Sequence, residues 1–431
     1  MIKKHVIFLF FFLISLSGCK NDRKENMINE KKQEAGQSKA STIISDINLN
    51  AEGPFLFNTG TQIILNWTQR DDHDKQKNML KFVFFNLEKQ KFGKIRTVTP
   101  AKGLQMHAES MAKVGMNARG IMYAVYRKKS KNDRSRFGGK LYYTISQDSG
   151  KTWSPEHLVV ADPKATSLSF YDIALLKNGE LGMSWLDNRR KLDPEHKGKC
   201  LFYGQTKDTN GFVIQKPIAG STCECCRTEI FVDSNGVIHV AYRNIIEPDE
   251  KGFDGYGFME IRDMYYLKST DNGKNFTKPM RLSEDNWHVN GCPHTGPSLA
   301  YNGQKLAGIW FTGVQNKSGI YYTDKEIKDT LFGHKKRITI EGRHPQMVSL
   351  DGNFYVVYEE YYEQNGKGYY KIVLHSIQPD YTEKQFEISR PLTQNNHPVI
   401  GVIDTDHLLV VWVNTDTRHP KIEYKIVPVK D

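Results

Sequence analysis

Short runs of apolar residues that end in tryptophan or tyrosine recur along most of the chain. Their last residues are Trp67, Tyr126, Trp185, Tyr242, Trp310, Tyr358 and Trp412. Neighbouring end residues lie about 57 positions apart on average, close to the length of one four-stranded blade with its loops. Each run follows a tight turn, such as residues 177–180, and precedes two further extended segments, except in the last repeat. The pattern predicts an all-β fold, a β-propeller of seven four-stranded blades.

The two ends of the repeat region complement each other. The last repeat has no fourth strand before Asp431, whereas an isolated apolar segment at residues 42–47 precedes the first repeat. A bare sheet edge is a hazard, because it can pair with another strand. We therefore expect the N-terminal strand to complete the last blade and close the ring.

Two octapeptides, at residues 146–153 and 269–276, share the pattern Ser-x-Asp-x-Gly-x-x-aromatic. Each follows a strand rich in tyrosine. The serine and aspartate side chains can bind nearby backbone N–H groups, and the glycine can adopt a positive φ. The pattern predicts a hairpin turn whose aromatic ring folds back on the blade. Its defining residues are Asp148, Gly150 and Trp153 in the first copy and Asp271, Gly273 and Phe276 in the second.

This octapeptide resembles the Asp-box of sialidase-type β-propellers, which marks the fold and not an active site. Sialidases have six blades, so six is the alternative to our count of seven. The resemblance continues through most of residues 50–430 to exported bacterial proteins labelled sialidase-like or exo-α-sialidase. It is carried by Ser184-Trp185-Leu186-Asp187-Asn188-Arg189, the Cys-x-Cys-Cys segment at 223–226, Tyr242-Arg243, Glu260-Ile261-Arg262-Asp263 and Gly291-Cys292-Pro293.

The first residues suggest export. A basic start is followed by an apolar run from Val6 to Leu16, which is too short to span a membrane comfortably. Leu16-Ser17-Gly18-Cys19 then resembles a bacterial lipobox, in which Cys19 becomes lipidated; the alternative is an ordinary secretory signal with an incidental cysteine. We expect a lipoprotein signal peptide at 1–19, a disordered tether at 20–40 and the propeller at 41–431. The protein would then be anchored to a membrane in the cell envelope, on the periplasmic side or the cell surface.

The formal net charge is +11 and, apart from the N-terminal tail, it is scattered along the chain. Such a surface attracts anionic partners, although solubility alone also explains it. The chain carries no recognisable nucleic-acid reader motif, so a nucleic-acid partner is not expected. With the sialidase-like resemblance, the charge favours a carbohydrate partner, an acidic glycan.

Propeller geometry sorts the polar residues by face. Loops that lead into the innermost strand and loops that leave the second strand meet around the axis, while the Asp-box turns lie on the opposite face. We expect His107, Arg227, His294, His344 and His397 to gather at one axial opening, which we call the axial mouth. The residues expected to bind a ligand there are Arg227, Arg343, His107, His344 and His397.

A group of cysteines leads into two neighbouring blades: Cys223, Cys225, Cys226 and, with His294 close behind it, Cys292. In an oxidising compartment Cys292 could form a disulfide with one of the first three. Alternatively, the thiolates and His294 could bind copper or zinc, or one thiol could be redox-active. No other cofactor is indicated.

The resemblance to sialidases implies three arginines that clamp the substrate carboxylate. The candidates are Arg189, Arg227, Arg243, Arg262 and Arg343, of which Arg243 and Arg262 are best placed by their sequence context. Asp71, Asp72 or Asp187 would be the general acid, and one of Tyr358, Tyr361 or Tyr362 beside Glu359 or Glu360 the nucleophile. The first-blade Arg-Ile-Pro motif is missing, because that stretch reads Gly53-Pro54-Phe55. The chain is thus expected to act on or bind acidic glycans at the axial mouth. The alternatives are a non-catalytic binding propeller and a metal or redox protein that uses the cysteines.

Overall fold

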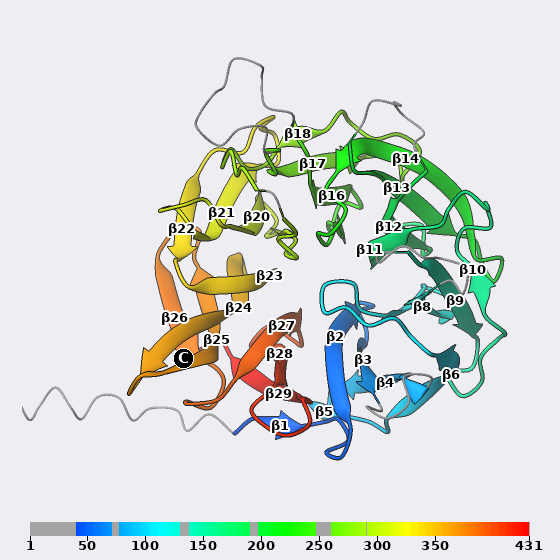
Figure 1. Ribbon diagram of the computed structural model, residues 1–431, viewed down its shortest axis with the longest axis horizontal. Helices are drawn as coiled ribbons and strands as arrows, with labels where there is room; N and C mark the ends of the chain where they lie inside the picture. The colour runs from blue at the N-terminus through cyan, green and yellow to red at the C-terminus, as the bar shows by residue number, and fades with distance from the viewer. Residues whose placement is uncertain are drawn as a thin grey trace, which may run out of the picture. The chain divides into compact units, whose positions relative to one another are not determined.

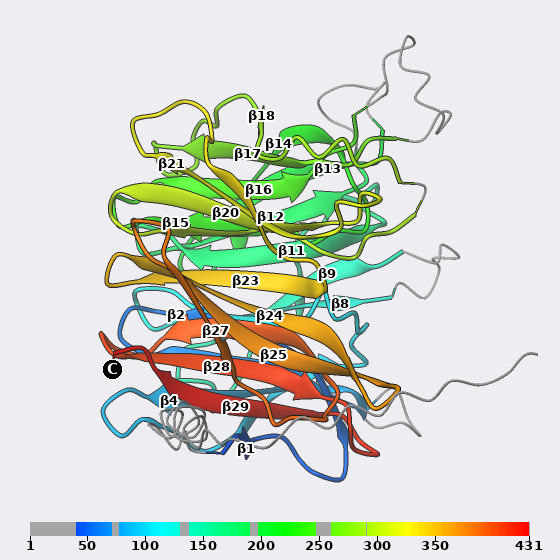
Figure 2. The ribbon, with the colours of Figure 1, turned by 90° about the vertical axis from the view of Figure 1, so that its left-hand side faces the viewer.

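Residues 40–430 form a ring of seven antiparallel sheets around a central axis (Figure 1). The computed structural model describes residues 40–70, 77–129, 138–189, 197–246, 260–289 and 291–430. The expected signal peptide, Cys19 and residues 20–39 of the expected tether lie outside the described residues. Seen from the side, strands such as β23, β24 and β28 run roughly along the ring axis (Figure 2).

Within the described ranges, no helix is long and apolar enough to cross a membrane.

Each blade has an innermost strand followed outward by the next strands along the chain. Blade one contains β2 (Asn50–Asn58), β3 (Ile63–Arg70), β4 (Met79–Asn86), β5 (Lys91–Phe92) and β6 (Arg96–Lys102). Blade two contains β7 (Lys113–Met116), β8 (Met122–Lys128), β9 (Lys140–Ser146) and β10 (His157–Leu158). Blade three contains β11 (Leu168–Leu175), β12 (Leu181–Asp187), β13 (Lys199–Thr206) and β14 (Phe212–Thr222).

The second half of the ring repeats this order. Blade four contains β15 (Glu229–Val232), β16 (Ile238–Arg243), β17 (Met264–Ser269) and β18 (Met280–Arg281). Blade five contains β19 (Ser298–Tyr301), β20 (Lys305–Thr312), β21 (Gly319–Glu326) and β22 (Lys335–Thr339). Blade six contains β23 (Gly342–Leu350), β24 (Asn353–Gln364), β25 (Lys367–Ile377) and β26 (Glu383–Glu387). Blade seven contains β27 (Asn395–Val402), β28 (His407–Asn414), β29 (Lys421–Pro428) and β1 (Thr42–Ile43).

The N-terminal strand closes the ring. Thr42 in β1 pairs with Tyr424 in β29, and the Ile44 amide donates to the Ile422 carbonyl at 2.9 Å. The predicted count of seven and the predicted closure are both confirmed, and the six-blade alternative is wrong. The repeat is visible in the sequence because its marker residues are core residues. The seven aromatic side chains that end the repeated runs are each at most 1% exposed.

Both Asp-boxes form the expected turns. In the first, Ser146 Oγ donates to Asp148 Oδ1 at 2.8 Å, and the Gly150 amide donates back to Ser146 Oγ at 2.8 Å. Gly150 has φ +78° and a Cβ there would lie 2.3 Å from Phe82, so a side chain does not fit. The Trp153 ring lies 5.8 Å from Phe82 of the preceding blade. The motif therefore also joins adjacent blades, a contact that the sequence did not reveal.

Buried charges link the innermost strands. Lys113 Nζ on β7 lies 3.0 Å from Asp172 Oδ1 on β11, and Asp172 Oδ2 accepts from the Ile230 amide on β15 at 3.1 Å. Glu229 Oε1 accepts from the Leu299 amide on β19 at 3.0 Å. These contacts join blades two to five near the axis. Burial, and then the Asp172 charge, raise the pKa of Glu229 to about 7.

This raised pKa predicts a pH-dependent stability. A carboxyl whose pKa is higher in the folded than in the unfolded protein destabilises the fold as pH rises from its unfolded pKa to its folded one. Glu229→Gln keeps an oxygen acceptor and removes the charge. We expect the variant to be more stable than the wild type at pH 8, by up to about 3 kcal/mol, and nearly equal at pH 5. Urea denaturation of both proteins at the two pH values tests this; an equal difference at both would contradict it.

Candidate functional site

The innermost strands bulge where they approach the axial mouth. The pairing register shifts at Glu52/Phe55 in β2, Ser169/Asp172 in β11, Arg343/Gln346 in β23 and Asn396/Val399 in β27. Each bulge contains a residue with positive φ, and these are Gly53 (63°), Phe170 (49°), His344 (48°) and His397 (47°). A bulge bends its strand and re-aims a side chain, and such bulges are common next to functional sites.

Two of these bulges hold histidines in a strained backbone. A side chain at positive φ costs about 1–3 kcal/mol. His344 and His397 also precede Pro345 and Pro398, and a residue before proline favours an extended conformation. The fold therefore holds both imidazoles in place at an energetic cost, which is a pattern typical of functional sites.

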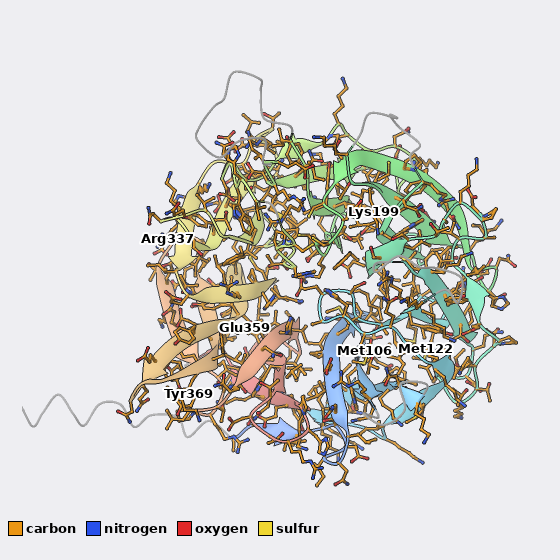
Figure 3. All side chains as sticks on the ribbon, in the orientation of Figure 1. Met106, Met122, Lys199, Arg337, Glu359 and Tyr369 are labelled. Carbon is orange, nitrogen blue, oxygen red and sulfur yellow. The ribbon has the colours of Figure 1, made fainter. Side chains whose placement is uncertain are left out.

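We define the axial cluster as Glu109, Arg227, His344, His397 and Glu359. Arg227 Nε lies 3.3 Å from Glu109 Oε2, and His397 Nε2 lies 3.9 Å from Glu109 Oε1. His344 Nδ1 lies 2.7 Å from Glu359 Oε1, and the His397 amide donates to Glu359 Oε2 at 2.6 Å. The rings of His344 and His397 stack with centroids 4.1 Å apart. Figure 3 labels Glu359, together with Met106, on the inner side of the ring.

A second pair of histidines adjoins this cluster. The His107 and His294 rings lie 5.0 Å apart, and His107 packs edge-on against Phe170 at 5.2 Å. The Glu109 amide donates to His107 Nδ1 at 3.2 Å. His294 Nδ1 is buried and has no hydrogen-bond partner within the described part of the chain. The structure thus brings together His107, Arg227, His294, His344 and His397, the five residues that the repeat register placed at the axial mouth.

Electrostatics sets the charge of the buried carboxylate. Burial alone would raise the pKa of Glu109, but Arg227, followed by the nearby histidines, outweighs it and holds the pKa below its usual value. Burial, and next His294, lower the pKa of His107 to about 4. Near neutral pH the centre therefore combines a charged carboxylate with a neutral imidazole.

The stacked histidines differ from each other. Burial, and then His344, lower the pKa of His397. Burial also opposes the charged form of His344, but the Glu359 carboxylate outweighs it and raises the pKa of His344. The pair therefore presents one imidazole that favours the neutral form beside one that favours the charged form.

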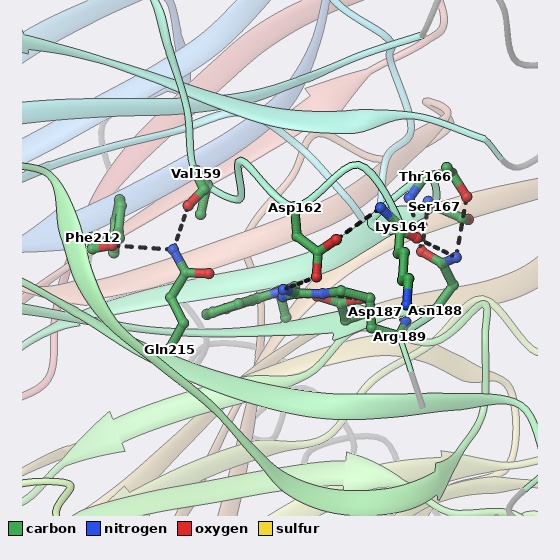
Figure 4. A network of polar contacts seen from close by, with 11 residues as sticks. Val159, Asp162, Lys164, Thr166, Ser167, Asp187, Asn188, Arg189, Phe212 and Gln215 are labelled. Carbon is green, nitrogen blue, oxygen red and sulfur yellow. Dashed lines mark hydrogen bonds and ion pairs between the residues drawn. The ribbon is translucent and has the colours of Figure 1, made fainter. Parts of the chain in front are cut away.

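Arg189 and Asp187 form an ion pair with each other. Arg189 Nη2 lies 2.6 Å from Asp187 Oδ2, and Arg189 Nη1 lies 3.4 Å from Asp162 Oδ2 (Figure 4). Asp187 is fully buried and also accepts from Trp185 Nε1 at 3.1 Å. This geometry gives both residues a structural role. The expected roles of Asp187 as a general acid and of Arg189 as a substrate clamp stay predictions. Asp71 and Asp72, the other candidates for the general acid, lie outside the described residues.

Arg243 and Arg262 are also occupied. Arg243 is 1% exposed, donates to the carbonyls of Arg262 and Phe311 at 2.9 Å, and stacks on Trp287. Arg262 lies 3.0 Å from Glu260 and donates to Cys223 Sγ at 3.1 Å. Both guanidiniums thus already have partners within the protein, and their expected role as carboxylate clamps stays a prediction.

Arg343 differs from these arginines, because its side chain is exposed next to the bulge at His344. Its guanidinium lies 4.9 Å from the Phe311 ring centroid, and no ion pair to it occurs within the described ranges. It is an exposed arginine directly beside His344 in the chain, and is therefore accessible to an anionic ligand.

The expected nucleophile pair is not formed. Tyr358 is fully buried and accepts from Gln385 at 3.0 Å, while the Tyr362 hydroxyl accepts from the Leu392 amide. Tyr361 packs edge-on against Tyr370. Glu359 holds His344 instead of a tyrosine.

Three cysteines form a compact group that we call the cysteine cluster. Cys223 Sγ lies 3.7 Å from Cys225 Sγ and 3.4 Å from Cys226 Sγ, and all three are at most 3% exposed. Hydrogen bonds from the other two thiols lower the pKa of Cys223 well below its usual value, helped by Arg262. The five cysteines of the described chain are free thiols, and Cys292 is exposed, so the disulfide between Cys292 and the cluster is not formed here.

This arrangement predicts a simple thiol titration. In the native, unreduced protein with Cys19 lipidated, we expect one fast-reacting thiol, Cys292, and four more that react only after unfolding, because these four are buried. An aromatic disulfide reagent monitored by absorbance gives both counts. Cys292→Ser is expected to remove the fast phase alone. A native protein without a fast-reacting thiol would contradict this prediction and would indicate that Cys292 is oxidised.

Two residues of the axial cluster were missed from the sequence as ligand-binding groups. Glu109 lies two residues after His107 in the segment that leads into blade two, and Glu359 directly follows Tyr358, the last residue of the apolar run of blade six. Their place in the repeat could have identified them, because both lie in segments that the repeat register assigns to the axial mouth. Their chemical role depends on partners from other blades.

Comparisons with known proteins place the chain by fold. No protein-family model matches it, and no curated protein matches its sequence. An ulvan lyase of polysaccharide lyase family PL25, bound to -[GlcA(1-4)Rha3S]-, matches with a TM-score of 0.54 and 11% identity over 90% of this chain and 96% of that chain. The polysaccharide lyase Uly1 gives 0.54 and 10% over 94% and 95%. The NanB sialidase from Streptococcus pneumoniae gives 0.47 and 10% over 91% and 71%. The likeness to the two lyases is one of fold alone.

Proposed function

We propose that this propeller binds an acidic polysaccharide at the axial mouth and acts on it there. The observation that carries the proposal is the axial cluster itself. Five side chains from separate segments meet at the opening, and two of them are held at positive φ before a proline. Such convergent polar groups on a rigid scaffold are typical of ligand sites.

Charge supports an anionic ligand. The chain carries a net charge of +11, and Arg343 stands exposed beside the histidines. A guanidinium binds a carboxylate or sulfate through paired hydrogen bonds. The ulvan lyases share the fold, and one is bound to a glucuronate–sulfated rhamnose unit. We therefore favour a uronate-containing or sulfated polysaccharide over a sialoside.

The sialoside alternative lacks its expected machinery. Gly53 stands where the first-blade arginine motif would be, and Arg189 and Arg243 are buried in structural contacts. A sialidase-type site needs arginines that face the substrate carboxylate. Sialylated glycans are retained as one ligand of the test.

The test compares ligands and variants. Titration calorimetry with uronate polysaccharides, sulfated polysaccharides and sialylated glycoprotein is set against neutral dextran. We expect binding of an anionic glycan only, weakened about tenfold in Arg343→Ala. The control is Arg337→Ala, an exposed arginine on the outer strand β22 (Figure 3). No binding to any acidic glycan, or equal binding by both variants, would overturn the proposal.

Product analysis then defines the activity. New reducing ends accompanied by unsaturated uronate absorbance indicate elimination, and reducing ends alone indicate hydrolysis. Binding without product supports the non-catalytic propeller that displays this face to a glycan.

We also propose that the protein works in the cell envelope, anchored through Cys19. The support is the lipobox-like sequence after a short apolar run. Palmitate labelling of the wild type and its loss in Cys19→Ser would support the anchor. Labelling that persists in the variant would reject it.

A metal or redox role for the cysteine cluster is the second candidate. Its sulfur distances of 3.4 and 3.7 Å suit three thiolates that share one metal with bonds of about 2.3 Å. Metal analysis after anaerobic purification, compared with Cys226→Ser, tests it. A cluster that is metal-free and oxidised to a disulfide would end this candidate.

A further inference from the structure

We infer that the axial cluster is a binding site for a divalent transition metal, with Glu109, His344 and His397 as the three protein ligands. One ligand atom from each residue lies within 4.8 Å of the other two. The Glu109 side chain is 4% exposed, whereas those of His344 and His397 are 19% and 20% exposed. The carboxylate thus forms the floor of the site and the imidazoles form its rim. Two histidines and one carboxylate hold such metals while leaving coordination positions open.

Glu359 orients the histidines from outside the ligand set. Its Oε1 lies 2.7 Å from Nδ1 of His344, which leaves Nε2 as the nitrogen available to a metal. Its Oε2 accepts from the backbone amide of His397 at 2.6 Å and so fixes the second bulge. Metal-binding histidines commonly bind a carboxylate through their other ring nitrogen. Glu359 is therefore a positioning residue.

The backbone strain fits the same role. His344 and His397 come from neighbouring blades, β23 and β27, and each is held at positive φ before a proline. The two bulges bring the rings to a centroid distance of 4.1 Å. The same bulge with positive φ recurs at Gly53 and Phe170, so this backbone conformation is shared by several blades, and blades six and seven place a histidine in it. The strained backbone brings the imidazole nitrogens of His344 and His397 together near Glu109.

Charge decides what binds to the metal. Glu109 and Glu359 supply two negative charges, and Arg227 beside Glu109 supplies a positive one. A bound divalent ion leaves the centre positively charged, so its open positions favour an anionic oxygen ligand. The carboxylate of an acidic sugar is such a ligand; this last step rests on the proposed function, whereas metal binding does not.

The cysteine cluster is the competing site, so the probe must separate them. Imidazole and carboxylate accept Mn²⁺ and Co²⁺, while thiolates favour softer ions such as Cu⁺ and Zn²⁺. The full-length protein, treated with chelator and then dialysed, is titrated with Mn²⁺ by electron paramagnetic resonance. Co²⁺ absorption then reports the donor atoms, because only thiolate ligation gives an intense near-ultraviolet charge-transfer band.

We expect one tightly bound Mn²⁺ and a Co²⁺ spectrum without the thiolate band. His397→Ala is expected to weaken Mn²⁺ binding by at least about tenfold, and Glu359→Gln by about 10–100-fold. The control His407→Ala replaces a histidine that pairs with Asp404 in another part of blade seven, and it should leave binding unchanged. The Mn²⁺ affinity of Glu109→Gln is compared with the wild type only if the variant has a native circular dichroism spectrum. This condition is needed because the substitution removes the charged partner of Arg227 and could unfold the protein.

Unchanged Mn²⁺ affinity in His397→Ala, or a thiolate band that disappears in Cys223→Ser, would overturn the inference. Failure here is distinct from failure of the proposed function. Glycan binding that survives chelation would support the proposed function but show that it does not need the metal. Metal binding without any glycan affinity would support the metal site and reject the proposed function.

Discussion

Asp187→Ala is expected to lower the free energy of unfolding by about 3–5 kcal/mol while glycan binding by the folded protein stays unchanged. The substitution leaves the Arg189 guanidinium, only 9% exposed, without its 2.6 Å partner. It also deprives Trp185 Nε1 of its acceptor in the core of blade three. Breaking a buried pair from one side is costly because the remaining charge is neither solvated nor neutralised. Urea denaturation, followed by tryptophan fluorescence, measures the loss.

Asp162→Ala is the matched control. Asp162 is the other carboxylate that Arg189 contacts, but it is 30% exposed and 3.4 Å away, so its loss should cost less than about 1 kcal/mol. If Asp187→Ala were as stable as the wild type yet inactive on an acidic glycan, the role of Asp187 would be chemical. The general-acid interpretation would then replace the structural one.

The fold could be predicted because its markers are the core residues themselves. Trp67, Trp185, Trp310 and Trp412 are all at most 1% exposed, and each lies two or three residues before the end of the second strand of a blade. An aromatic side chain in a sheet is placed by local pattern and burial together, so the repeat spacing reports the blades directly. The closing strand followed from the same count, since one blade lacked a strand at one end of the chain.

The arginines show which features of the site cannot be predicted from the sequence. Arg189, Arg243 and Arg343 read alike along the chain, as an arginine near the end or start of a strand. In space, two of them are buried against partners and one is exposed at the mouth. Burial and pairing depend on side chains from other strands and other blades, such as Phe311 for Arg243. Residue type and spacing cannot supply that information.

The bulges were hidden for a different reason. Positive φ is usually signalled by glycine, yet three of the four bulge residues carry side chains: Phe170, His344 and His397. The His-Pro dipeptides at two of these positions point instead to an extended backbone. These three residues lie at the axial mouth, where strain of this kind is often retained for function, although positive φ also occurs in turns elsewhere, as at Tyr381 and Leu392.

Gly53→Arg is expected to destabilise the protein by about 3 kcal/mol and to give no sialidase activity. The substitution places an arginine where the sialidase-like resemblance requires one. Gly53 has φ +63°, and a Cβ there would lie 2.9 Å from Met111 Cβ. The new residue is both strained and crowded, so the side chain cannot enter the mouth without displacing Met111. Thermal unfolding and a sialoside hydrolysis assay measure the two effects.

Gly60→Arg separates the two causes of the loss. Gly60 also has positive φ, +86°, but nothing lies within 4 Å of a Cβ at that position. Its substitution should cost only the backbone strain of about 1–2 kcal/mol, so the excess in Gly53→Arg measures the crowding by Met111. Equal losses at both positions would mean that the mouth has room for a side chain at residue 53. An arginine could then reach the axis from blade one. The fold would therefore not be the reason why the first-blade arginine is missing.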